Sequence, residues 1–359
     1  IADLLSAPDP DRIIFTLNAS DALNLAIKGI AHHERARRVR EGSNKPVHFI
    51  ATSMDHNSVL RPLNALAADP VGPPVEWTCL DADPETGLVD PARLSGAIRP
   101  ETALVIAVHA SNVSGTLQPI EDFGQVCRDR GVPFLVDAAQ SAGRVPIDAG
   151  VADLIAVPGH KYLLGPLGTG ALVMRPGIEE RVDTIREGGT GTVSEQDTQP
   201  DSLPDRYEPG SHNTIGIVGL DAGVEWILGR GVDRLWADEQ RHIERITDAL
   251  ADRDAFPGLR LIGPKTGDHR VGVFSFVHEA VEPLEFAAIL ESEFGILSRA
   301  GVHCAPRAHG TFATRDTGGA TRLSLGPFIS AQDIEHTLDA LGEICTHAAT
   351  PRGTYGATL

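Results

Sequence analysis

In the first three-fifths of the chain, short apolar segments rich in β-branched residues alternate with longer segments of helical periodicity. The apolar segments have the length and composition of buried strands and lie at 47–51, 103–108, 133–136, 154–157 and 170–174. The helical patterns lie between them, at 21–40, 57–68, 91–98 and 120–130. Strands separated by helices form crossover units, so this alternation predicts an α/β fold built on a mostly parallel sheet.

The pattern changes in the last two-fifths. Residues 179–213 are rich in Gly, Pro and Thr and read as a loop. Helices are then expected at 215–229, 232–253, 283–293 and 331–345, with strands at 271–277 and 321–325. We therefore expect a large domain over residues 1–225 and a smaller α+β domain over residues 226–359, with fraying after residue 347.

Charge and cysteine content exclude several classes of protein. The formal net charge is −18, which argues against binding to nucleic acid or to an anionic membrane surface. No segment reaches the roughly 18 apolar residues of a membrane span. The four cysteines form no CxxC pair, so we expect neither a disulfide framework nor a metal site, and reduced thiols fit the cytoplasm.

Polar signatures follow four of the expected strands. They are Asp55-His56, 109–112, 137–140 and 159–161. Ligands of parallel α/β sheets bind beyond the carboxyl ends of the strands. These four segments therefore predict one binding site at that edge of the sheet.

Lys161 and Asp137 have the properties that pyridoxal 5'-phosphate requires. Lys161 lies in a Gly/Pro turn after a buried strand, where desolvation favours the neutral amine that forms imines; the alternative is an ordinary surface lysine. Asp137 ends a strand and could keep the pyridine nitrogen protonated; the alternative is a helix cap. Gln140 and Asn112 could donate hydrogen bonds to the ring oxygen.

Two further residues fit a cofactor site, although each has a structural alternative. Ser20 lies directly before the helix expected at 21–40, and its hydroxyl with the amides at the start of that helix could bind a phosphate, or could simply cap the helix. His56 follows the first buried strand and could stack on an aromatic ring and move protons. A single histidine at such a position is more often structural.

The order of several motifs resembles the class V cysteine desulfurases, which are related to selenocysteine lyases. The motifs are NASDALN (18–24), MDHNSV (54–59), HASNVSGT (109–116), VDAAQS (136–141), PGHK (158–161), RYEPGSHN (206–213), RAGVHCAP (299–306) and TRLSLG (321–326). The match runs over nearly the whole chain and is closest to the short-loop, SUF-like branch. It implies a fold-type I transferase with a seven-stranded sheet and a homodimer. The N-terminal part of the small domain is expected to be missing before Ile1.

The resemblance also implies roles for individual residues. Lys161 is the Schiff-base lysine, Asp137 pairs with the pyridine nitrogen, and His56 stacks on the ring. The phosphate contacts are implied for Ala19, Ser20, His160 and Ser211, the last from a neighbouring subunit. Gln140 and Asn112 lie on the ring-oxygen side. Arg322, with Asn112, Arg299 and His303, is implied to bind the substrate, and Cys304 is the thiol that receives its sulfur.

The expected activity is conversion of L-cysteine to L-alanine, with a persulfide on Cys304 that passes to an acceptor protein. The alternatives are a selenocysteine lyase, another C–S lyase or epimerase using the same cofactor, and a non-catalytic sulfur-relay component. The sequence departs from the family pattern at Pro158 and in the phosphate loop at 18–20. The segment between Cys304 and Arg322 is also longer than in short-loop members.

Overall fold

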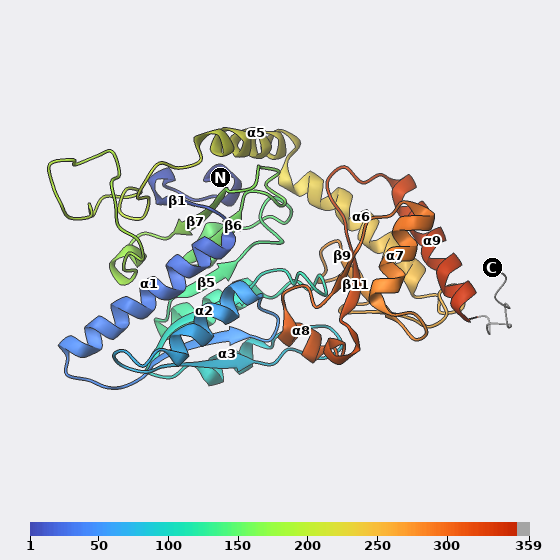
Figure 1. The fold of residues 1–359 in the computed structure, drawn as a ribbon, viewed down its shortest axis with the longest axis horizontal. Helices are drawn as coiled ribbons and strands as arrows, with labels where there is room; N and C mark the ends of the chain where they lie inside the picture. Colours follow the sequence, from blue (N-terminus) through green and yellow to red (C-terminus); the bar gives the residue numbers. More distant parts are fainter. Residues whose placement is uncertain (350–359) are drawn as a thin grey trace, which may run out of the picture. The chain divides into compact units, whose positions relative to one another are not determined.

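The computed structural model describes residues 1–349, which divide into two compact units. The large unit comprises Ile1–Ala82, Leu88–Ser111 and Leu117–Trp236. The small unit comprises Asp83–Gly87, Asn112–Thr116 and the residues from Ala237 onward. The boundary between the units thus lies within a helix, α6 (Val232–Leu250). Figure 1 shows the order of the elements along the chain.

The large unit is built on a seven-stranded sheet in the order β1-β7-β6-β5-β4-β2-β3. The strands are β1 (Ile13–Thr16), β2 (Val47–Thr52), β3 (Val75–Leu80), β4 (Thr102–Val108), β5 (Phe134–Asp137), β6 (Leu154–Pro158) and β7 (Gly170–Met174). Only β7 runs against its neighbours β6 and β1, so six of these strands point the same way. The expected mostly parallel sheet is confirmed.

Burial explains why the central strands are apolar along their whole length. Every residue of β2, β4, β5, β6 and β7 is buried, as expected for strands that helices cover on both faces. The helices are α1 (Ala19–Arg40), α2 (Asn57–Ala68), α3 (Pro91–Ala97), α4 (Ile120–Arg130) and α5 (Thr214–Arg230). Helix α1 contacts β7, β6, β5 and β4 and so crosses most of the sheet (Figure 1).

The small unit contains a four-stranded antiparallel sheet in the order β10-β11-β9-β8. Its strands are β8 (Leu259–Leu261), β9 (Val273–His278), β10 (Arg299–Gly301) and β11 (Ala320–Ser324). Its helices are α7 (Pro283–Phe294), α8 (Pro306–Thr311) and α9 (Ala331–Ala349), of which α7 packs against α9 and the sheet. Most of the residues after 347, where fraying was expected, lie outside the described residues. In the described part, no helix is both long and apolar enough to cross a membrane.

Candidate active site

The sheet topology brings the large-unit candidates to one edge. Strands β2, β4, β5 and β6 are parallel, so His56, His109, Asp137 and His160-Lys161 follow at the same edge. Strand β1 is antiparallel to β7, which is antiparallel to β6, so β1 also ends there. The amino end of α1, with Ala19 and Ser20, therefore begins at this edge too.

Asp137 is the last residue of β5, and its side chain is buried. Its Oδ1 accepts a hydrogen bond from the backbone N–H of Ala139 at 2.9 Å. Residues 138–144 form turns, so Asp137 caps no helix. Within residues 1–349 no donor reaches its Oδ2. A buried carboxylate with one oxygen available fits a partner that carries a proton, such as a pyridinium nitrogen.

Asp55 is a second buried carboxylate near Asp137, and the sequence analysis gave it no role. Its Oδ2 accepts from the N–H and the hydroxyl of Thr52, and its Oδ1 accepts from the N–H of Val108 at 2.8 Å. Burial raises the pKa of Asp55 to about 7, and the charge of Asp137 adds to the increase. Asp55 thus connects the ends of β2 and β4 and fixes the backbone that leads to His56.

His56 begins α2 and is linked to the amino end of α1 through two hydroxyls. Its Nδ1 accepts from the N–H of Ser58 at 3.1 Å and lies 2.9 Å from the Ser58 Oγ. The Ser58 Oγ in turn lies 2.6 Å from the Oγ of Ser20. Because Nδ1 accepts from the backbone, the proton of the neutral ring is on Nε2. Ser58, which the sequence analysis missed, therefore couples the expected ring-stacking histidine to the expected phosphate site.

Lys161 is half-buried in a tight connection between β6 and β7. A Cβ on Gly159 would lie 2.0 Å from the Oγ1 of Thr169, so this position accepts only glycine. The Gly159 N–H donates to Thr169, and the Gly159 carbonyl accepts from Gly165. These contacts fix the backbone next to Lys161.

His160 also fits a phosphate site. Its Nδ1 is buried and has no hydrogen-bond partner within the described residues. Burial lowers the pKa of His160, and the charge of Lys161 adds to the decrease. A buried ring nitrogen without a partner, at the sheet edge where α1 also begins, is consistent with a bound phosphate monoester.

Gln140 and Ser211 complete the large-unit candidates. Gln140 is half-buried in the turn after β5, and Ser211 is exposed in the loop before α5. That loop is fixed close to Ser211, because Glu208 accepts a hydrogen bond from the N–H of Phe15 and lies 3.7 Å from His212. The exposure of Ser211 fits the expectation that it serves another copy of the chain.

The small unit brings the remaining five candidates together. Arg299 on β10 and Arg322 on β11 are directly opposite each other in the antiparallel register. Arg322 Nη1 donates to the carbonyl of Asn112 at 3.0 Å, and the Asn112 Nδ2 donates to the carbonyl of His303 at 2.7 Å. Arg299 Nη2 lies 3.9 Å from the Sγ of Cys304. Two guanidinium groups and a thiol thus share one small cluster.

Cys304 lies in an excursion between β10 and β11, over residues 302–319. His303 and Cys304 both have positive φ, at 50° and 58°, which is uncommon for side chains larger than glycine. The base of the excursion is narrow, since a Cβ on Gly319 would lie 2.1 Å from the carbonyl of Gly301. The backbone around the thiol is therefore held in a strained conformation that its surroundings must stabilise.

A chain of buried hydrogen bonds stabilises this excursion. His303 Nε2 donates to the Arg299 carbonyl at 3.0 Å, so its Nδ1 is an acceptor. His309 Nε2, 3.2 Å away, donates to that Nδ1, and the Thr314 hydroxyl donates to His309 Nδ1 at 2.7 Å. The family resemblance implies that His303 binds substrate, but its ring is buried and both ring nitrogens form hydrogen bonds within the small unit. His309 was missed, and its only signal was a second histidine six residues after His303.

The chain is similar in sequence and in fold to known proteins. Residues 1–337 match the family model of class V aminotransferases. A probable cysteine desulfurase of Methanothermobacter thermautotrophicus is 33% identical over 340 residues, which cover 93% of this chain and 79% of the relative. One from Pyrococcus abyssi is 30% identical and covers 96% and 81%. The apo cysteine desulfurase of Thermococcus onnurineus NA1 has a TM-score of 0.84 at 29% identity, covering 96% of this chain and 82% of that one.

Proposed function

The chain belongs to the class V aminotransferase family, and on this basis we propose that it is a pyridoxal 5'-phosphate-dependent cysteine desulfurase. The substrate is L-cysteine, and the products are L-alanine and a persulfide on Cys304. The observation that carries the proposal is the small-unit cluster, in which the Cys304 thiol contacts Arg299 and Arg299 lies opposite Arg322 in the strand register. A carboxylate-binding arginine beside a thiol suits an amino acid whose sulfur is to be removed.

The large-unit residues fit the cofactor. We propose that Lys161 holds it, that Asp137 uses its available oxygen to keep the pyridine nitrogen protonated, and that His56 covers the ring. Ala19, Ser20 and His160 hold the phosphate, and Gln140 and Asn112 lie on the side of the ring oxygen. When bound, pyridoxal phosphate withdraws electrons from the α-carbon of the amino acid.

The chain's own groups carry out the remaining steps. Arg322 binds the α-carboxylate with its forked guanidinium and orients the substrate. The Lys161 amine removes the α-proton and returns a proton as general base and acid. The Cys304 sulfur attacks the substrate sulfur, the carbon–sulfur bond breaks, and its electron pair is protonated on the carbon that becomes the alanine methyl group. Arg299 stabilises the negative charge of the attacking sulfur.

The test is a product assay on L-cysteine with the cofactor-loaded enzyme. We expect alanine in solution and a sulfur adduct on the Cys304 peptide by mass spectrometry. Both should be lost in Cys304→Ala and retained in Cys79→Ala. Pyruvate and sulfide with unmodified Cys304 would instead indicate a C–S lyase. Borohydride reduction should add the cofactor to the Lys161 peptide only, and Lys161→Ala should prevent this.

We further propose that the enzyme is a homodimer and that the persulfide passes to an acceptor protein. The support for a dimer is apolar surface close to Ser211. Ile215 and Val218 on α5 are 88% and 65% exposed, and Leu167 in the β6–β7 connection is 76% exposed. Large apolar side chains are rarely grouped on a surface that stays exposed to water. Ile215→Asp should convert a dimer into a monomer in sedimentation, and should weaken cofactor binding because Ser211 would no longer reach its partner's site.

A further inference from the structure

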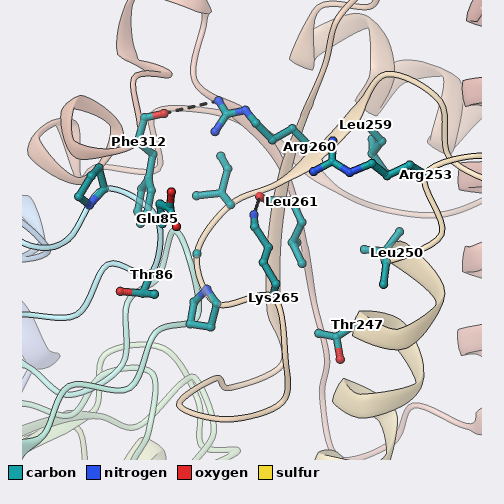
Figure 2. A pocket seen from close by; sticks show the side chains of 15 residues that line it. Glu85, Thr86, Thr247, Leu250, Arg253, Leu259, Arg260, Leu261, Lys265 and Phe312 are labelled. Carbon is teal, nitrogen blue, oxygen red and sulfur yellow. Dashed lines mark hydrogen bonds between the residues drawn. The ribbon is translucent and has the colours of Figure 1, made fainter.

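A cavity of about 500 Å³ lies in the small unit, and none of the residues discussed above as active-site groups lines it. It is formed by the end of α6, strand β8 and the segment that follows, the loop at 84–86, and Phe312. Its volume is in the range of sites that bind small molecules. Figure 2 shows the side chains that surround it.

Three cations line this cavity. Arg253, Arg260 and Lys265 are part of its wall, and within residues 1–349 none of the three forms an ion pair. The lining contains one carboxylate, Glu85. This is a local excess of positive charge in a chain whose net charge is −18.

A fourth cation lies behind the wall. The Arg270 side chain is completely buried, and its three nitrogens donate to the carbonyls of Pro264, Val273 and Ile262. No carboxylate in the described part of the chain pairs with it. Backbone carbonyls hold this guanidinium in place without cancelling its charge, so Arg270 adds to the positive potential in the cavity.

Lys265 is the residue best placed to contact a ligand. The residue as a whole is exposed, but its Nζ turns back and donates to the carbonyl of Leu261, as Figure 2 shows. Partial removal of the amine from water lowers the pKa of Lys265 to about 8, and Arg270, Arg260 and Arg253 add to the decrease while Glu85 opposes it. An anion beside the amine would relieve this repulsion and favour the charged form.

Most of the remaining lining is apolar, apart from Thr86 and Thr247. Leu250, Leu259, Ile262, Phe312 and two prolines contribute to it. We propose that this cavity binds a small organic anion, a phosphate or carboxylate on a compact apolar body, with Lys265, Arg253 and Arg260 holding the anionic group. The site is separate from the residues assigned to the desulfurase reaction, so its ligand is neither the substrate nor the cofactor.

The composition of the chain makes a direct test possible. It has only four lysines, at positions 28, 45, 161 and 265. The holoenzyme is acetylated with limiting acetic anhydride, and each lysine peptide is quantified by mass spectrometry. Phenyl phosphate, phenylacetate and inorganic phosphate are the probes, and the cofactor already occupies the catalytic phosphate site.

We expect phenyl phosphate or phenylacetate to protect Lys265 at least fivefold with a saturable dose dependence, and to leave Lys45 unprotected, since its side chain is 72% exposed. Inorganic phosphate should require at least tenfold higher concentration, because it lacks the apolar body. The midpoint of Lys265 acetylation against pH should rise from about 8 when the probe is bound.

Variants distinguish the cavity from general anion attraction. Arg253→Met and Arg260→Met should each raise the protecting concentration several-fold, whereas Arg315→Met, an exposed arginine of the same unit outside the cavity, should not. Equal protection of Lys265 and Lys45, linear protection without saturation, or protection unaffected by Arg253→Met would each overturn the proposal. Which of the two organic probes binds more tightly identifies the anionic group.

Discussion

Nε2 of His309 lies 3.2 Å from Nδ1 of His303, and both rings are buried within the excursion that carries Cys304. Because the other ring nitrogen of His303 donates to a carbonyl, this contact has one direction, from His309 to His303. His309 therefore acts on the thiol only through its neighbour, by fixing the left-handed turn at His303 and Cys304. It is a positioning residue, and its effect should differ from that of a group that touches substrate.

Replacing His309 by Leu should remove the donor to His303 and leave a buried nitrogen unpaired. The small unit should lose about 1–3 kcal/mol of stability. We expect kcat to fall while KM for L-cysteine stays nearly constant, with an altered rate of Cys304 alkylation. His309→Gln, which retains an N–H donor, should recover part of the lost kcat. The same substitution at the exposed His347 is the control, and a rise in KM alone would contradict a positioning role.

The buried rings of His303 and His309 also predict a pH dependence of the stability of the fold. Burial lowers the pKa of His303 to about 3 and that of His309 to about 4, compared with 6.5 for an unfolded histidine. Below pH 6.5 the unfolded chain therefore binds protons that the folded chain does not, and stability falls as pH falls toward these values. Each histidine contributes at most about 1.4 kcal/mol per pH unit. Denaturant unfolding between pH 6.5 and 5 gives the slope of the unfolding free energy against pH. This slope should be smaller in His309→Gln than in the unmodified chain, by the equivalent of nearly one proton. Identical slopes would refute the assignment.

The sheet was predictable because its central strands are apolar along their whole length. Strands β2, β4, β5, β6 and β7 were predicted within one residue at each end. Strand β3 was missed because it lies at the sheet edge, where Glu76 is exposed and interrupts the apolar run. Strand β1 was missed because four residues after a Pro/Asp-rich stretch carry little periodicity.

The site was predictable only in part. Asp137 and Lys161 follow buried strands, and parallel topology alone brings them to one edge. Asp55, Ser58 and His309 act through contacts with residues that the sequence does not associate with them. Asp55 bonds to Val108, 53 positions away, and Ser58 to Ser20, 38 positions away. Such contacts depend on side-chain packing, which no local pattern encodes.

The two arginines that face each other across β10 and β11 should have separable roles. Arg322→Lys keeps the charge but loses the fork, so we expect KM for L-cysteine to rise about tenfold, equivalent to about 1.4 kcal/mol. Alkylation of Cys304 by iodoacetamide should stay nearly unchanged. Arg299→Gln should instead change the rate of Cys304 alkylation and leave KM for L-cysteine nearly unchanged, because Arg299 contacts the sulfur. Equal effects of both substitutions on KM would show that the pair acts as one carboxylate site.

Ser58 connects the Ser20 hydroxyl to the His56 ring, and its removal should affect the cofactor rather than the substrate. Ser58→Ala removes the hydroxyl that Ser20 and His56 share but keeps the backbone N–H that donates to His56, and a hydrogen bond of this kind contributes about 0.5–1.5 kcal/mol. The dissociation constant for pyridoxal phosphate, measured by absorbance titration of the apoenzyme, should therefore rise about 2- to 10-fold. KM for L-cysteine at saturating cofactor should not change. Ser292→Ala on α7 in the small unit is the matched control, and a Ser58→Ala variant with unchanged cofactor affinity would mean that Ser20 and His56 are held independently.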